Sequence, residues 1–305
     1  MTILDELAAY ARVRVEKAKE AVSLEEMRER ALTMNVQTEF MENASSGKGL
    51  AQRNIVRNDI AQTESLRSGI THIDSVKIGS APFAFEKVLS GPDMGFICEV
   101  KKASPSKGLI AEDFPYVEIA EEYEKAGAEC ISVLTEPKWF LGSGEYLREI
   151  ADHVKTPCIR KDFTVDEYMI YEAKVLGASA VLLICSLLDT KTLEAYIRVA
   201  DSLGLSALVE AHDEEEIRSA AAAGARMIGV NNRNLKDFTV DVHNSERLRK
   251  LVPDGILFVA ESGIRGPGDV RAMKEAGADA CLVGETLMRA QDKAAMLQAL
   301  REGTC

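Results

Sequence analysis

Short apolar runs recur along the chain, each following a helix-like segment and a glycine. The stretches that share this order are EKAGAECISVL (124–134), KVLGASAVLLI (174–184), AAAGARMIGV (221–230) and KEAGADACLVG (274–284). Their glycines, at positions 127, 177, 224 and 277, fall about 50 residues apart. Glycine just past a helix is the usual left-handed cap, and an apolar run without alternation suits a parallel strand buried on both faces. The pattern therefore predicts repeated helix–strand units.

Four further apolar runs lie between these units. They are GFICEV (95–100), TPCIRKDF (156–163), LSALVEA (205–211) and GILFVAESG (255–263). Amphipathic stretches with acidic first turns separate the runs, as at 166–176 and 213–224. One strand–helix unit of a barrel takes about 25–30 residues. A repeat of about 50 residues therefore spans two units and marks every second one. Eight strands alternating with helices predict an α/β fold, a closed (β/α)8 barrel. The alternative, an open doubly wound sheet, lacks its Gly-x-Gly-x-x-Gly signal here.

The first 80 residues follow a different pattern. Ile3, Leu4, Leu7 and Ala11 form a helical apolar stripe, which predicts an N-terminal helix packed on the barrel. Residues 34–80 are polar and hold no sustained stripe, so we expect a surface excursion, with an insertion at about 40–78. The predicted organisation is an N-terminal helical extension over 1–80 and a catalytic barrel over 81–305.

Composition narrows the classes of protein that fit. The chain has 305 residues, 46% of them hydrophobic, which is ample for a full core. Its net charge of −12 argues against sequence-independent nucleic-acid binding. Six cysteines form no C-x-x-C motif, so we expect reduced core thiols and a cytoplasmic location. The opening residues lack the apolar core of a secretory signal, and no run approaches membrane-spanning length.

Polar residues gather at the carboxyl ends of the predicted strands, where the active sites of such barrels form. In chain order they are Glu99 and Lys101, then Arg160, Lys161 and Asp162, then Glu210, Asn231 and Arg233, and finally Glu261, Ser262, Gly284 and Glu285. Glu99 and Lys101 share one face because side chains alternate along a strand. A single charge at such a place suits a solvated strand end or an ion pair. Charges on five strands predict one pocket with shifted pKa values.

Glycines follow the last two predicted strands, in ESGIRG (261–266) and LVGETLM (282–288). They allow backbone N–H groups to point at an anion near helix N-termini, and barrels often bind phosphate in these two loops. Ordinary helix caps are the alternative. The pattern predicts a phosphorylated small-molecule ligand without identifying it.

Taken together, the motifs resemble the indole-3-glycerol-phosphate synthase family from about Phe83 onward. The blocks that carry the resemblance are EVKKASPSKG (99–108), EPKWFLGS (136–143), RKDF (160–163), LVEAH (208–212), GVNNRNL (229–235), ESGI (261–264) and VGETLM (283–288). ESGI alone is weak because other phosphate-binding barrels share it. The resemblance implies a carboxy-lyase of tryptophan biosynthesis. Its reaction closes 1-(2-carboxyphenylamino)-1-deoxyribulose 5-phosphate to indole-3-glycerol phosphate, with loss of carbon dioxide and water.

The resemblance also implies the catalytic residues, which are Glu99, Lys101, Lys161, Glu210, Asn231 and Ser262. Lys161 corresponds to the general acid, a role that suits a lysine whose surroundings lower its pKa. Lys101 corresponds to a lysine that contacts the substrate carboxylate. Glu99 and Glu210 correspond to carboxylates that handle protons and stabilise an iminium charge, and Asn231 to an orienting group.

Substrate-binding residues follow from the same resemblance. Arg233 corresponds to a support near Asn231, and Ser262, Gly263, Gly284 and Glu285 correspond to a phosphate cradle. Ser104, Pro105, Phe140 and Leu183 correspond to the pocket of the anthranilate ring. Lys107 is a second, mobile cation, and Lys102 faces outward by alternation. No metal or organic cofactor is expected, and no nucleic-acid or membrane partner. We expect a monomer or a weak homo-oligomer.

Three other functions stay open at this stage. One is another phosphate-binding barrel enzyme such as phosphoribosylanthranilate isomerase. A second is an aldolase that uses Lys161 as a Schiff-base nucleophile. The third is a barrel that keeps its phosphate site but serves as a binding subunit without catalysis.

Overall fold

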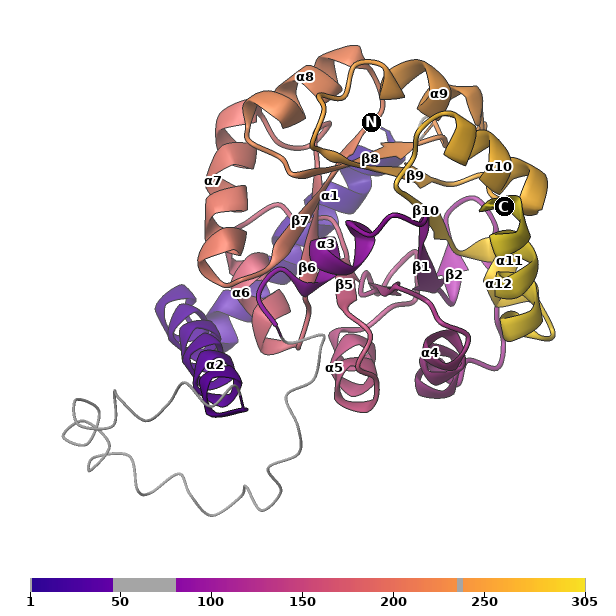
Figure 1. Cartoon of the computed structure of the whole chain (residues 1–305). Coiled ribbons are helices and arrows are strands. Elements are labelled where there is room, and N and C mark those ends of the chain that lie inside the picture. The colour runs from indigo at the N-terminus through magenta and orange to yellow at the C-terminus, as the bar shows by residue number, and fades with distance from the viewer. Residues whose placement is uncertain (1, 46–80, 235–237, 305) are drawn as a thin grey trace.

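The barrel is closed by eight parallel strands in a computed structural model that describes residues 2–45, 81–234 and 238–304 (Figure 1). Around the barrel the order is β1-β10-β9-β8-β7-β6-β5-β4, and β4 pairs with β1 to close it. The strands are β1 (Gly95–Val100), β4 (Cys130–Leu134), β5 (Cys158–Lys161), β6 (Ala180–Ile184), β7 (Ser206–Ala211), β8 (Met227–Asn231), β9 (Leu257–Glu261) and β10 (Ala280–Val283). The predicted (β/α)8 barrel is confirmed.

Helices cover the outside of the barrel between successive strands. They are α4 (Tyr116–Lys125), α5 (Gly144–His153), α6 (Tyr168–Val175), α7 (Thr190–Ser202), α8 (Glu214–Ala222), α9 (His243–Arg249), α10 (Pro267–Glu275), α11 (Glu285–Arg289) and α12 (Lys293–Arg301), with a 3-10 turn at Glu302–Thr304. The four repeat glycines, Gly127, Gly177, Gly224 and Gly277, have φ of 85–87°. Each ends a helix in the left-handed conformation that glycine adopts without strain, as the sequence predicts.

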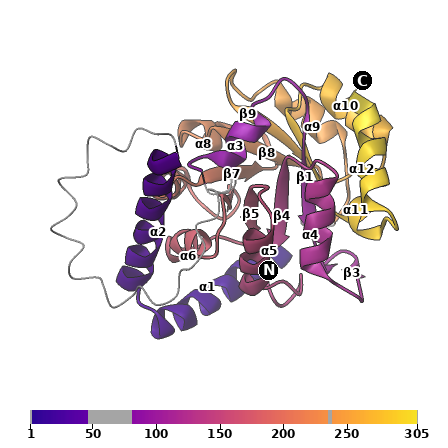
Figure 2. The same ribbon diagram turned by 60° about the horizontal axis from the view of Figure 1, so that its bottom comes forward.

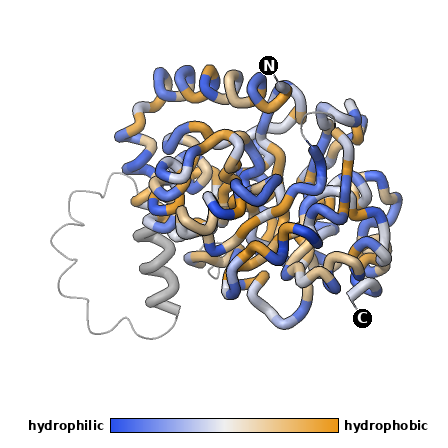
Figure 3. The backbone as a smooth tube through the Cα atoms, turned by 90° about the horizontal axis from the view of Figure 1, so that it is seen from above, coloured by the Kyte–Doolittle hydropathy of each residue, from blue (hydrophilic) through white to orange (hydrophobic). Residues whose placement is uncertain are grey.

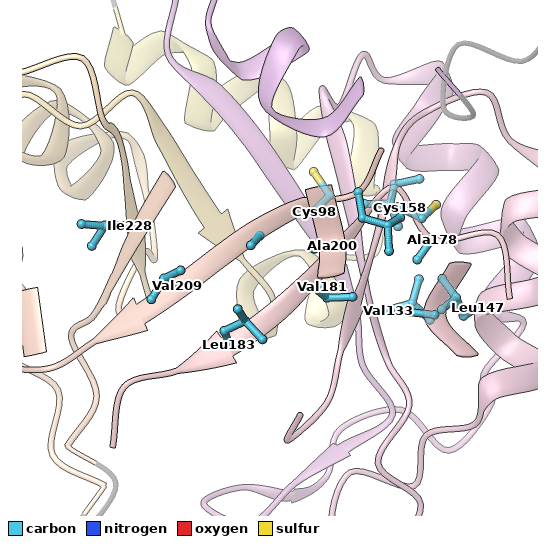
Figure 4. Packing of buried hydrophobic residues seen from close by; sticks show 14 of the residues in the cluster. Cys98, Val133, Leu147, Cys158, Ala178, Val181, Leu183, Ala200, Val209 and Ile228 are labelled. Atoms are coloured by element: carbon cyan, nitrogen blue, oxygen red, sulfur yellow. The ribbon is translucent and has the colours of Figure 1, made fainter. Parts of the chain in front are cut away.

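Two apolar layers hold the barrel together. Inside it, residues such as Ile97, Ile159 and Leu208 fill the lumen, so the barrel is a packed core rather than a channel. The short helix α3 (Ala84–Leu89) closes its N-terminal end with Phe85 and Leu89. A second layer lies between the outer faces of the strands and the helices, and Figure 4 shows part of it. Charged side chains gather at the C-terminal end of this largely apolar lumen.

Two helices precede the barrel and lie along one side of it (Figure 2). The first, α1 (Ile3–Ala21), begins with a capping box at Thr2 and buries Leu7, Ala11 and Val15. Along this helix hydrophobic and hydrophilic residues alternate turn by turn (Figure 3), and the predicted N-terminal helix is confirmed. The second, α2 (Leu24–Ser45), packs beside α6 and was not predicted. Its mixed polar sequence gives only a faint apolar stripe, with Met27 and Ala31 buried.

The predicted insertion at 40–78 falls largely on residues outside the described ranges. Residues 40–45 belong to the end of α2, and 46–78 are among those that the structure does not describe. Within the described ranges, no helix has the length and apolar character needed to span a membrane.

Candidate active site

A cavity of about 640 Å³ opens at the carboxyl ends of the barrel strands. Its lining includes the six candidate catalytic residues, Glu99, Lys101, Lys161, Glu210, Asn231 and Ser262. It also includes the candidate binding residues Ser104, Pro105, Phe140, Arg233, Gly263, Gly284 and Glu285. Residues from seven strands or from the loops that follow them therefore meet in one place. The predicted pocket exists at the predicted end of the barrel.

The floor of the cavity is a cluster of two lysines and three carboxylates. Lys161 Nζ lies 3.2 Å from Glu210 Oε2 and 3.1 Å from Glu261 Oε2. Across the lumen, Lys101 Nζ forms an ion pair with Glu99 Oε2. The three glutamates are only 2–4% exposed. Burying so much charge is costly unless the charges pair with one another, as they do here.

Pairing and burial move the pKa values in this cluster apart. Burial disfavours the charged form of Lys161, but Glu261 and Glu210 outweigh that effect and raise its pKa. At Glu210, burial acts to raise the pKa, but the positive charges of Lys161 and His212 outweigh it, so the pKa is lowered. At Glu261, burial and the neighbouring Glu210 prevail over Lys161 and raise the pKa to about 7. The condition that would favour Lys161 as an acid, a lowered pKa, is therefore not met, because two carboxylates surround it and raise its pKa.

Strand alternation sends the two neighbours of Lys161 to the outer face. Asp162 accepts two hydrogen bonds from the Arg14 guanidinium of α1, at 3.0 and 2.6 Å, and one from Thr135 Oγ1 at 2.7 Å. Arg160 pairs with Glu172 of α6 at 2.7 Å. Since Asp162 directly follows Lys161, the clamp from Arg14 fixes the end of β5 from behind. The N-terminal helix therefore supports the position of the lysine.

Two glycine-containing loops, after β9 and β10, line one part of the cavity. Ser262 and Gly263 both have positive φ, 67° and 87°, and a Cβ at position 263 would lie 2.8 Å from Val240 Cγ1. Glu285, at the start of α11, pairs with Arg289 at 3.1 Å and with Lys107 at 3.5 Å. Its carboxylate is thus engaged with two cations, which lower its pKa against the opposing effect of burial.

Apolar side chains form one wall of the cavity. Phe140 and Phe163 lie with ring centroids 6.1 Å apart, and Pro105 lies on the same lining. Ile3 and Leu7 of α1 add to it, so the N-terminal helix reaches the cavity. This wall is suited to a flat apolar ring.

Leu183 does not reach the cavity, and its predicted place in the ring pocket is corrected here. On β6 the inward residues are Leu182 and Ile184, which line the cavity. Leu183 points to the outer face and packs in the layer shown in Figure 4, with Val181 and Val209. The reason is the period of two along a strand, by which neighbouring residues face opposite sides. Lys102 faces away from the lumen as predicted, with its Nζ 5.9 Å from the centre of the Phe114 ring.

Asn231 and Arg233 follow the end of β8. Asn231 Oδ1 accepts a hydrogen bond from the Arg233 backbone N–H at 3.0 Å, and Arg233 Nη1 donates to the Phe238 carbonyl at 3.2 Å. The Asn231 side chain also hydrogen-bonds Glu210. Asn231 thus links the loop to the carboxylate cluster.

Glu261 was not among the candidate site residues, although its position at a strand end gave a signal. Gly229 makes room for it, because a Cβ there would lie 2.1 Å from Glu261 Oε1. A glycine inside a strand often marks a close approach of this kind. The glycine within MIGV of β8 was therefore a second, weaker signal that a side chain from a neighbouring strand lies against it. Within the described ranges, no group of three His, Cys, Asp or Glu side chains is arranged to hold a metal ion.

Comparison with known proteins identifies the family. The sequence model described as "Indole-3-glycerol phosphate synthase" matches residues 54–300. A protein of that name from Ruminiclostridium cellulolyticum is 60% identical over 224 residues, which cover 73% of this chain and 86% of the relative. Another from Lachnoclostridium phytofermentans is 52% identical over 227 residues, covering 74% and 84%. The chain belongs to the indole-3-glycerol phosphate synthase family.

The family match covers every residue that lines the barrel part of the cavity. Its start at residue 54 also places 54–78 of the predicted insertion inside the matched range. Among solved structures, a 3-hexulose-6-phosphate synthase is similar with a TM-score of 0.57 and 16% identity, covering 70% of this chain and all of that one. At that identity the likeness shows the barrel fold alone. The assignment to the indole-3-glycerol phosphate synthase family therefore rests on sequence.

Proposed function

We propose that the chain converts 1-(2-carboxyphenylamino)-1-deoxyribulose 5-phosphate to indole-3-glycerol phosphate, carbon dioxide and water. One observation carries the proposal: a buried lysine, Lys161, is held between Glu210 and Glu261 on the floor of a cavity with an apolar wall. Family membership gives the reaction, and this cluster supplies the acid and base groups that the reaction needs.

Lys161 is suited to act as the general acid. It is protonated at neutral pH and lines the cavity, and a positioned ammonium can donate a proton to the carbonyl oxygen as the aromatic carbon attacks. Glu210, with its lowered pKa, stays ionised beside it. An ionised carboxylate at this place stabilises the positive charge that develops on the substrate nitrogen.

Glu261 is suited to exchange protons during the dehydration. A carboxyl group with a pKa of about 7 is present in both protonation states near neutral pH, which is the condition for efficient acid–base catalysis. In the step that forms the indole ring, we assign Glu261 one of two roles. It removes the methylene proton, or it returns a proton to Lys161.

The remaining residues divide between the two ends of the substrate. Lys101, close to Glu99, would contact the carboxylate that leaves as carbon dioxide, and the wall around Phe140 would hold the ring. Backbone N–H groups at Gly263 and Gly284 would bind the phosphate. Arg265 and Arg289 line that end of the cavity and add positive charge.

The Schiff-base alternative is disfavoured by the same cluster. An aldolase lysine must lose its proton to attack a carbonyl, and burial or a nearby cation usually lowers its pKa. Two carboxylates within 3.2 Å have the opposite effect on Lys161. Trapping with borohydride in the presence of substrate would give a covalent adduct only if this alternative were right.

The test is turnover of the substrate followed by indole fluorescence. Wild-type protein should produce indole emission, and Lys161→Met should lower kcat by about 10²–10⁴-fold, the usual contribution of a general acid. Lys102→Met is the matched control, since Lys102 is the neighbour of Lys101 but faces Phe114, and its kcat should stay within about twofold. No emission from the wild-type protein would refute the proposed function.

A further inference from the structure

A second cavity of about 490 Å³ lies on the other side of Glu210 from the lumen. His212 and Glu216 line it, together with Ser186, and Asn231 borders both cavities. His212, Glu216 and Ser186 do not belong to the proposed catalytic cluster. Their contacts connect that cluster to the outside of the protein.

Close contacts between polar atoms run from Lys161 to solvent, and each step but the one from His212 to Glu210 is a hydrogen bond. Glu210 Oε2 faces Lys161 Nζ at 3.2 Å, while its other oxygen, Oε1, lies 3.4 Å from His212 Nε2. On the far side of the ring, His212 Nδ1 lies 3.1 Å from Glu216 Oε2. Ser186 Oγ donates to Glu216 Oε1 at 2.5 Å. Burial decreases along the series, from Glu210 to the half-buried His212 and Glu216 and the exposed Ser186.

One ring nitrogen of His212, Nε2, faces Glu210. Nε2 is buried, and among the described residues it makes no hydrogen bond, although it faces Glu210 Oε1. The backbone N–H of His212 donates to Glu216 Oε2 at 2.7 Å, which fixes the ring between the two carboxylates. A ring held in this way can accept a proton at Nδ1 and release one from Nε2.

The proposed reaction consumes one proton in each turnover. The bond between the ring carbon and the carboxylate breaks, and its electron pair restores aromaticity as neutral carbon dioxide leaves. The carbonyl oxygen takes up two protons and leaves as water, while the methylene carbon loses one proton to a base. The balance is one proton, which must come from solvent to Lys161, whose side chain is only 13% exposed.

We propose that His212 and Glu216 form the route by which this proton enters, through Glu210, to recharge Lys161. The inference rests on the proposed function, because only a reaction with net proton uptake needs such a route. His212 touches no reacting atom, and it acts through Glu210. Glu216 takes the proton from solvent at the second cavity and passes it to His212 Nδ1, and Nε2 then passes one to Glu210 Oε1.

The charges around His212 are consistent with this role. Glu210, Glu216 and the more distant Glu261 raise its pKa against the effect of burial. From the other elements at the second cavity, Asp213, Asp241 and Arg247 face the same space. The excess of carboxylates keeps the imidazole protonated to higher pH than a free histidine, so a proton is held ready beside Glu210.

The experiment compares kcat of wild type, His212→Gln, His212→Ala and Glu216→Gln over pH 6–9 at low buffer concentration. The amide introduced by Glu216→Gln keeps an oxygen that can accept the His212 N–H but cannot carry a proton. We expect each variant to lose about tenfold or more in kcat, increasingly as pH rises, with KM little changed. Added imidazole should restore part of the kcat of His212→Ala, and sodium chloride at equal ionic strength should not.

His243→Gln is the matched control. His243 faces Glu246 at 3.4 Å, as His212 faces Glu216, but it is exposed and lines neither cavity. Its kcat and pH profile should match those of the wild type. Variants within twofold of wild type, or an equal loss at every pH without imidazole rescue, would overturn the proton route and leave a structural role only. A wild-type protein without turnover would instead refute the proposed function, and the route with it.

Discussion

Arg14→Met tests whether the N-terminal helix holds the catalytic strand in place. Arg14 donates two hydrogen bonds to Asp162, whose side chain is fully buried directly after Lys161. Methionine keeps the unbranched stem of arginine and removes only the guanidinium. The carboxylate of Asp162 would then keep Thr135, the Phe163 backbone N–H and the more distant Arg160 as partners but lose its closest positive charge.

The expected cost follows from the burial of the pair. Removing one partner of a buried ion pair costs about 3–5 kcal/mol. Because the Arg14 side chain is 20% exposed and Asp162 keeps three partners, we expect the lower end, about 3 kcal/mol. For a domain of this size, 1 kcal/mol shifts Tm by about 2–4 °C, so Tm should fall by about 6–12 °C. A loosened β5 should also lower kcat, since a displacement of about 1 Å at a catalytic group can cost 10²-fold.

The assay is thermal and urea unfolding, with kcat measured on the same samples. Arg12→Met is the control, since Arg12 lies on the exposed face of the same helix and should change Tm by less than about 1 °C. A double-mutant cycle with Asp162→Asn isolates the pair. A loss below about 0.5 kcal/mol for Arg14→Met, or no coupling in the cycle, would show that α1 does not clamp the end of β5.

Two further predictions concern the glutamates of the cluster. The folded-state pKa of Glu261, about 7, lies above its unfolded value of 4.5, so its contribution to stability is present below pH 4.5 and lost as pH rises through 7. Urea unfolding of wild type should therefore lose about 3 kcal/mol between pH 5 and 8 relative to Glu261→Gln, and parallel pH profiles would contradict the raised pKa. Gly284→Ala places a Cβ 2.1 Å from Glu99 Oε2 and 2.7 Å from Lys101 Nζ. Because those atoms end flexible side chains, the free energy of unfolding should change by only about 1 kcal/mol or less. The displaced Glu99–Lys101 pair should nevertheless lower kcat by about 10²-fold. An unchanged kcat would show that Gly284 does not position this pair.

The barrel was predictable because its signals are local and repeated. Each Gly-Ala step reports a left-handed helix cap followed by a strand, and all four repeat glycines have positive φ. Polar residues at one end of several strands meet because parallel strands share a direction, so the cavity was predictable as well. Both inferences needed only the period of the elements and the closure of the sheet.

Leu183 was placed one residue out of phase, and β alternation turns such an error into the opposite face of the sheet. The other parts that were missed depend on contacts between distant segments. The direction of the Lys161 pKa shift depends on Glu261, which is 100 residues away in sequence. The helix α2 has little apolar stripe of its own and is placed through its packing on α6. In both of these cases the deciding information is tertiary.

The charges of the site divide it into two functional regions. At the centre, Lys101 and Lys161 bring two positive charges against the three carboxylates of Glu99, Glu210 and Glu261. With Glu261 protonated, as a pKa of about 7 allows, the centre is neutral, and it gains little by attracting a substrate that carries a carboxylate and a phosphate. We expect the arginines that line the cavity, Arg233, Arg265 and Arg289, to provide that attraction instead. These arginines should therefore contribute to substrate binding. The paired charges of the centre should instead interact with the charge that develops only in the transition state, and an interaction made there raises the rate.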